Sequence, residues 1–406
     1  MNECRQEPGR FLAKITRQEV STFATAGTKS KKTDVKRVAA CMVRDLFGSI
    51  LYASVEKRID LAEVLKYPLT PVPLSLCHVD GTMLKTPKSA LMQYLENKVK
   101  SNSPEHIDVT IIDASFYFHL LPGAALPTKF GGISSHILRK IMASEGDEIH
   151  FVSDKWLSPS IKDCERAARD GSVNSFKITG GNQKRPANWM SALRNAGFKE
   201  SLVKYLVASW SDDCNVKHLG TKTLYANDGD TCYKYVVEGN SVMKSEESRY
   251  SNDHEEADAR MFFHVHKITG QKNIVIRTND TDCLVIGLGS RSNFCNHKVW
   301  IDAGLVSNNT RRYIDMTKLA ANLGESLCSA MPAYHAFTGC DYTAAFSRKG
   351  KVRPLKILEK NANFQNSFTA LGKEQTISDE TFSSIEKFTA EMYGKRKSQF
   401  INDIRL

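Results

Sequence analysis

The chain has 406 residues and is basic, with 56 Lys and Arg against 45 Asp and Glu and a net charge of +11. A hydrophobic content of 41% and a charged content of 25% are those of an ordinary globular protein with one large domain or two to three smaller ones. No apolar run of about 18 residues occurs, and the N-terminus (MNECRQEPGR) lacks an apolar signal core, so we expect neither a membrane span nor a secretory signal.

The positive charge indicates which partners to expect, and the cysteines indicate which kinds of protein to exclude. A basic surface favours polyanionic partners such as nucleic acid or anionic lipid, although a merely basic protein would have the same composition. The 10 cysteines are scattered without a CxxC pair, which excludes a zinc ribbon and a secreted disulfide framework. The sequence therefore predicts an intracellular protein without a membrane partner. Lys29–Lys32 (KSKK) would allow a nuclear location, but it fits a solvated loop better.

Residues 1–104 are predicted to form a mostly helical accessory region without chemistry of its own. Apolar residues recur at helical spacing in Val35–Ala53. The segment Tyr67–Leu76 (YPLTPVPLSL) contains three prolines, so it cannot be a helix interior and is expected to be extended.

Residues 105–358 are predicted to form one α/β domain, in which strands alternate with helices. Such alternation implies a twisted parallel sheet flanked by helices, in which ligands bind beyond the carboxyl ends of the strands. The expected strands are Val109–Asp113, Glu148–Ser153, Ile274–Thr278 and Lys298–Ile301. An insertion of about 176–250, with a helix over Trp189–Trp210 and a hairpin around Asn227–Asp230, interrupts the domain. Residues 359–406 are expected to be a partly helical, frayed tail.

Carboxylates stand at the ends of these predicted elements. Gathered acids raise each other's pKa, so a fold that brings them together would need cations between them. Hard oxygen ligands suit Mg²⁺ or Mn²⁺. The acids are Asp113 and Asp154 after the first two strands, Glu256 and Asp258 at a helix start, Asp280 and Asp282 after the third strand, and Asp341 in TGCDY.

Two of these clusters also have plain structural interpretations. Asp253 and Glu256 have the spacing of a helix capping box, and Ala257, Met261, Phe262 and Val265 would form the buried stripe of that helix. Asn279–Asp282 could be a turn with solvated aspartates.

Five short motifs occur in a fixed order: IIDAS, FVSD, EEADA, TNDTDCLVIG and GCDY. Together they resemble the flap-endonuclease branch of the PIN-like 5′ nucleases, and within it the divergent Asteroid-like proteins, over residues 107–358 without the insertion. The resemblance implies a PIN-like fold and a structure-selective or single-strand nuclease. It would hydrolyse phosphodiester bonds with two Mg²⁺ or Mn²⁺ ions, and DNA is favoured over RNA as its nucleic-acid partner.

The resemblance also assigns roles to residues. The acids named above would be metal ligands, and Lys162 and Arg169 would offset charge on the scissile phosphate. Arg166 lies between them; without the resemblance, all three would be a solvated helix face. Glu255 has no counterpart, and Asp302 is expected to be structural.

A basic stretch follows the last acid. Arg348, Lys349, Lys351 and Arg353 could hold phosphates without reading sequence, and no sliding-clamp peptide is evident in the tail. Two other functions stay open. One is a catalytically inactive PIN-like protein that binds nucleic acid or acts as a scaffold. The other is an α/β phosphotransferase that uses the DTD motif, although no GxxxxGK[ST] loop is present.

Overall fold

The structure is a computed structural model that describes residues 31–65, 67, 69–70, 72–157, 160, 176–294, 296–305, 309–373, 375–395 and 401. These residues fall into two compact units. The first contains the described residues up to Leu84 together with Ala344–Ser347, and the second contains Lys85–Thr343 and the described residues from Arg348 onward.

The first unit is built around the long helix α3 (Lys31–Lys57), which contains the helix predicted from apolar spacing. A short helix, α4 (Leu61–Val64), follows, and the Asp60 carboxylate caps it by accepting from the backbone N–H groups of Ala62 and Glu63. The described part of the proline-rich segment contains no helix, as predicted, but it consists of bends and turns and not of the expected extended chain.

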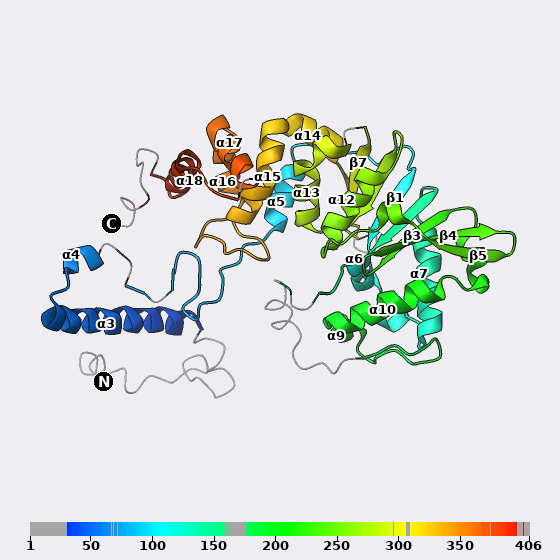
Figure 1. Cartoon of the computed structure of the whole chain (residues 1–406), viewed down its shortest axis with the longest axis horizontal. Helices are drawn as coiled ribbons and strands as arrows, with labels where there is room; N and C mark the ends of the chain where they lie inside the picture. The colour runs from blue at the N-terminus through cyan, green and yellow to red at the C-terminus, as the bar shows by residue number, and fades with distance from the viewer. Residues whose placement is uncertain are drawn as a thin grey trace, which may run out of the picture. The chain divides into compact units, whose positions relative to one another are not determined.

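The second unit contains a sheet of eight strands among the described residues, flanked by helices (Figure 1). Its parallel centre has the order β3-β2-β1-β6-β7, with β1 in the middle. These strands are β1 (Val109–Asp113), β2 (Glu148–Val152), β3 (Thr223–Asp228), β6 (Asn273–Arg277) and β7 (Lys298–Ala303). The antiparallel strands are β4 (Thr231–Glu238), β5 (Ser241–Glu246) and β8 (Arg312–Asp315), of which β5 and β8 form the two edges of the sheet. The predicted mixed α/β class is confirmed.

The region 176–250, which was predicted as an insertion, contributes the strands β3, β4 and β5 to this sheet. The predicted hairpin exists, with Gly229 at a positive φ of 60° in its turn, but its first strand β3 also pairs in parallel with β2. The predicted single helix is two, because Asn195 accepts from the N–H of Phe198 and starts a new helix. The helices of this region are α9 (Trp189–Ala192), α10 (Ala196–Ser209) and α11 (Val216–Leu219).

Alternating side chains of the central strands fill two cores, one on each face of the sheet. Ile112 and Phe151 face the helices α6 (Ala114–Leu120), α7 (Phe130–Met142) and α10. Ile111 and Ile276 face the other layer. That layer comprises α12 (Ala257–Lys267), α13 (Thr281–Gly289), α14 (Met316–Leu323) and α15 (Glu325–Phe337).

Two segments outside the predicted domain also belong to the core on the face covered by α12, α13, α14 and α15. Helix α5 (Ser89–Glu96) buries Leu91, Met92 and Leu95 against it, so the second unit begins at Lys85 and not at residue 105. Helix α16 (Val352–Leu358) ends the predicted domain, and α17 (Ala362–Leu371) and α18 (Asp379–Met392) follow in the predicted tail. Phe368 and Phe388 are fully buried, so this part of the predicted frayed tail is packed. Among the described helices, none has the length and apolar character required to cross a bilayer.

Candidate metal centre

The carboxylates predicted as metal ligands all line one cavity of about 970 Å³ in the second unit. It lies where the strand order turns back, because the chain proceeds from β1 to β2 and β3 on one side and continues with β6 and β7 on the other. Ligands of open α/β sheets bind at this point. The lining acids are Asp113, Asp154, Glu256, Asp258, Asp280, Asp282 and Asp341.

Strand alternation brings Asp113 and Thr278 into contact. Asp113 has the same parity along β1 as Val109 and Ile111, so its side chain is on the face covered by α12 and α13. It is buried, and its Oδ1 accepts from the N–H of Phe116 at 3.0 Å, which caps α6. Its Oδ2 accepts from the hydroxyl of Thr278, just beyond β6, at 3.2 Å.

Asp154 connects β2 to the start of α12. One of its carboxylate oxygens accepts from the Ser115 hydroxyl and the other from the N–H of Ala257, both at 2.9 Å. The alternative interpretation of Glu256 as part of a capping box is wrong, because Glu256 is the N-cap residue of α12 and has no side-chain capping bond. Instead, the Glu256 carboxylate accepts from the hydroxyl of Tyr342 at 2.8 Å. The predicted stripe is confirmed, since Ala257, Met261, Phe262 and Val265 are all buried.

Asp280 is the N-cap residue of α13 and Asp282 lies in the first turn of this helix, which begins four residues after the end of β6. The Asp280 Oδ1 caps this helix by accepting from the N–H of Asp282 at 2.9 Å. Asp258, Asp280 and Asp282 each offer one carboxylate oxygen, and these oxygens lie within 4.8 Å of one another. Three carboxylate oxygens at this spacing can hold a metal ion.

The negative charge of the cavity is compensated unevenly. Burial and the neighbouring Asp154 raise the pKa of Asp113 from 3.8 to about 7. Burial and the carboxylates of Asp280 and Asp113 raise the pKa of Asp258 well above its ordinary value. Burial also opposes ionisation of Asp282, but hydrogen bonds from His335 and Lys88 outweigh it and lower the pKa of Asp282 to about 2. The Asp113 and Asp258 side of the cavity is therefore where a cation would be stabilised most.

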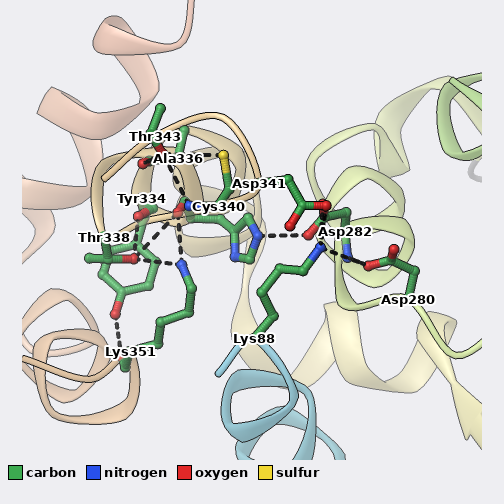
Figure 2. Close-up of polar contacts among 11 residues, drawn as sticks. Lys88, Asp280, Asp282, Tyr334, Ala336, Thr338, Cys340, Asp341, Thr343 and Lys351 are labelled. Atoms are coloured by element: carbon green, nitrogen blue, oxygen red, sulfur yellow. Dashed lines mark hydrogen bonds and ion pairs between the residues drawn. The ribbon is translucent and has the colours of Figure 1, made fainter. Parts of the chain in front are cut away.

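Lys88 is a residue of the site that sequence reasoning missed. It precedes α5, in the region predicted to have no chemistry. Its ammonium lies 2.9 Å from an oxygen of Asp282, 3.1 Å from Asp341 and 3.4 Å from Asp280 (Figure 2). Burial lowers its pKa, but the charges of Asp280 and Asp282 outweigh burial and raise it overall. No local pattern marks a single lysine before a helix as the partner of acids some 190 residues away.

His335 on α15 is the second missed residue. Its Nε2 lies 2.8 Å from Oδ1 of Asp282, so a neutral imidazole with its proton on Nε2 can donate to that carboxylate. Burial lowers the pKa of His335, which favours this neutral form. The imidazole thereby fixes the orientation of Asp282.

The prediction that Lys351 binds phosphate is corrected by the structure, because this lysine is buried. It is only 1% exposed, and its ammonium donates to the carbonyl of His335 at 2.8 Å and to the hydroxyl of Thr338 at 3.0 Å, at the end of α15 (Figure 2). It cannot reach a phosphate on the surface because it serves the last turn of α15. Arg348 and Arg353 are exposed, and the Lys349 ammonium lies 4.3 Å from the Tyr393 ring centroid.

The remaining residues with a predicted role are three basic residues of one helix and Asp302. The predicted basic helix with Lys162, Arg166 and Arg169 lies outside the described residues. Asp302 is buried and does not line the acidic cavity. It pairs with Arg277 at 2.6 Å and with Arg311 at 2.9 Å, which supports the structural role expected of it.

No known protein-family model matches the chain, and no curated protein matches it significantly. The functional conclusion therefore depends on the geometry of the acidic cavity.

Proposed function

We propose that this chain is a metal-dependent nuclease that hydrolyses phosphodiester bonds in structured or single-stranded nucleic acid. The observation that carries the proposal is the convergence of carboxylates from separate segments into one cavity at the point where the strand order turns back. A net charge of +11 supports a polyanionic substrate, of which DNA is the first to test.

The fold is compatible with a PIN-like domain. The parallel strands have the order β3-β2-β1-β6-β7. Four of the motifs that resemble PIN-like nucleases fall at the carboxyl ends of these strands or at the starts of α12 and α13, and the fifth, GCDY, follows α15. We therefore propose that the resemblance of these motifs reflects a common architecture.

The chain's own residues would prepare the reaction. Asp258 and Asp280, with Asp113 beside them, would hold the cation, and the hydrogen bonds to Asp282 and Glu256 from His335 and Tyr342 would keep those carboxylates oriented. A bound Mg²⁺ or Mn²⁺ supplies a Lewis acid that activates water and stabilises charge on phosphate oxygens; the resemblance implies two such ions. Lys162 and Arg169 would offset charge on the phosphate.

One observation favours the second candidate function, a nucleic-acid-binding or scaffold protein without turnover. Lys88 already neutralises part of the acidic cluster through its contacts with three carboxylates. A cluster that is neutralised from within can be stable without binding metal. Tight, salt-dependent binding of nucleic acid without any products would identify this alternative.

The test is cleavage of end-labelled flap, single-stranded and duplex DNA, and of the matching RNA, with Mg²⁺ or Mn²⁺. We expect products that EDTA abolishes. Asp258→Asn and Asp280→Asn should each lower the rate by about 100-fold or more. Asp379→Asn, which changes an acid in the first turn of α18, is the matched control and should cleave like the wild type. Intact substrates with both metals would refute the catalytic proposal.

A further inference from the structure

We propose that the side chain of Lys88 takes the place of one cation in the acidic cavity, so that the site binds a single divalent ion beside Asp258 and Asp280. The inference rests on the proposed function for its catalytic meaning, but it concerns ion binding and can be tested without cleavage. It differs from the two-ion site that the resemblance implies.

The contacts of the Lys88 ammonium are those of a bridging cation. An ammonium has three N–H donors, and here it lies within 3.4 Å of Asp280, Asp282 and Asp341. These carboxylates come from the start of α13 and from the turn after α15, and Figure 2 shows the lysine between them. A metal ion that joined the same two segments would need the space that the ammonium occupies.

Lys88 is held in this position by the packing of its own segment. Helix α5 begins one residue later and packs against α13 and α16, with Leu91 and Leu95 completely buried. Three residues earlier, the Lys85 ammonium donates to the backbone carbonyl of Asp341 at 2.6 Å. The Lys88 side chain is 21% exposed. Withdrawing it from the acids would therefore require a new side-chain conformation or movement of a packed helix.

The remaining carboxylates leave one place for a divalent ion. Both oxygens of Asp282 already accept hydrogen bonds, one from His335 and the other from Lys88. No lysine or arginine among the described residues forms an ion pair with Asp113 or Asp258. Since one carboxylate oxygen each of Asp258, Asp280 and Asp282 lies within 4.8 Å of the others, these acids can hold one ion.

This arrangement would change how a phosphate is bound. A divalent ion on the Asp258 side and a fixed ammonium on the Asp341 side would present two positive centres to one phosphodiester. Unlike a metal ion, the ammonium cannot activate water, but it can donate a hydrogen bond to a phosphate oxygen. Lys88 would thus supply the second positive charge of the site. This charge would not depend on the concentration of the metal ion.

The test counts bound Mn²⁺ by equilibrium binding with electron paramagnetic resonance, using the full chain. We expect one tightly bound ion in the wild type and in Lys88→Arg, which keeps the charge. Lys88→Met keeps an apolar stem without the charge and should bind two ions. Lys360→Met is the matched control, because Lys360 is an exposed residue of the second unit that does not line the cavity, and it should bind one. Circular dichroism and thermal unfolding check that each variant is folded, and Lys88→Gln serves as a second neutral variant.

The outcomes separate this inference from the proposed function. Two tightly bound ions in the wild type, or an unchanged count in both neutral variants, overturn the inference even if the protein cleaves nucleic acid. A change from one ion to two supports it even if no substrate is cleaved. If no Mn²⁺ binds to the wild type or to the Lys88 variants, the inference fails together with the metal-dependent mechanism.

Discussion

Replacement of Asp113 by Asn should stabilise the metal-free protein at alkaline pH. The Asp113 carboxyl is buried among other acids, and its pKa rises from 3.8 to about 7. Asn keeps an oxygen that can cap α6, as Oδ1 of Asp113 does for the N–H of Phe116, but it carries no charge. The variant therefore removes the electrostatic cost of the buried carboxylate while it keeps the local hydrogen bond.

The magnitude follows from the pKa shift. Because the folded protein raises this pKa, the protonated carboxyl favours the fold. This stabilisation of the folded state is fully present below pH 3.8 and is lost as the pH rises to about 7. A shift of about 3 pKa units at about 1.4 kcal/mol each gives a cost of up to about 4 kcal/mol at pH 8. Asp113→Asn should recover up to this amount at pH 8 and almost none at pH 4.

The assay is urea unfolding followed by tryptophan fluorescence in EDTA, at pH 4 and at pH 8. The chain has four tryptophans, Trp156, Trp189, Trp210 and Trp300, and all belong to the second unit, so the signal reports the unfolding of that unit. Adding Mn²⁺ at pH 8 should stabilise the wild type more than the variant, because a bound cation offsets the same charge.

The result that would contradict this reasoning is a variant that is equally or less stable than the wild type at pH 8 in EDTA. Such a result would mean that the Asp113 carboxylate is already compensated in the free protein. The cavity would then have no need of a cation at this position, and the proposed metal centre would lose its electrostatic basis.

Three further predictions concern residues outside the metal ligands. Asp302→Ala leaves two arginines without their buried partner and should lower the free energy of unfolding by about 3–5 kcal/mol, with an unchanged Mn²⁺ count. Burial lowers the pKa of His264 well below 6.5, so its contribution to stability is present above that pH and is lost as the pH falls. In urea unfolding from pH 7.5 to pH 5, His264→Phe should lose less stability than the wild type, by at most about 1.4 kcal/mol per pH unit; an equal loss would contradict the neutral state of this buried imidazole. Arg353→Gln should reduce the slope of log affinity for DNA against log salt by about 1, whereas Lys351→Met should leave that slope unchanged and destabilise the fold by about 1–3 kcal/mol. A lower slope in Lys351→Met would show that this lysine reaches phosphate after all.

Local sequence patterns predicted the parallel strands that lead to the carboxylates of the cavity. Apolar runs that end in an acid identified β1 and β2, and the helix start at Glu256 and Asp258 followed from the periodic apolar stripe behind it. The same type of pattern misjudged β3, because a strand followed by a tight turn looks like half of an isolated hairpin. Only its parallel pairing with β2 shows that it belongs to the central sheet.

The packed C-terminal helices and Lys351 were misjudged for a related reason. A lysine in a basic stretch is normally solvated, and nothing nearby in the sequence shows that Lys351 lies beneath the end of α15. Likewise, Phe368 and Phe388 become core residues only because their helices pack together with α15.

The amino-acid sequence by itself determined which acids leave the ends of strands and open helices, because the alternation of β-strands and the spacing of helices are properties of a few neighbouring residues. The tertiary structure alone decided how the charge of those acids is balanced. Lys88 reaches Asp282 and Asp341 because α5 packs on α13, and this packing depends on apolar contacts between segments that are far apart in the chain. Coulomb energies depend on distance and burial, and both are fixed only when the whole domain has folded.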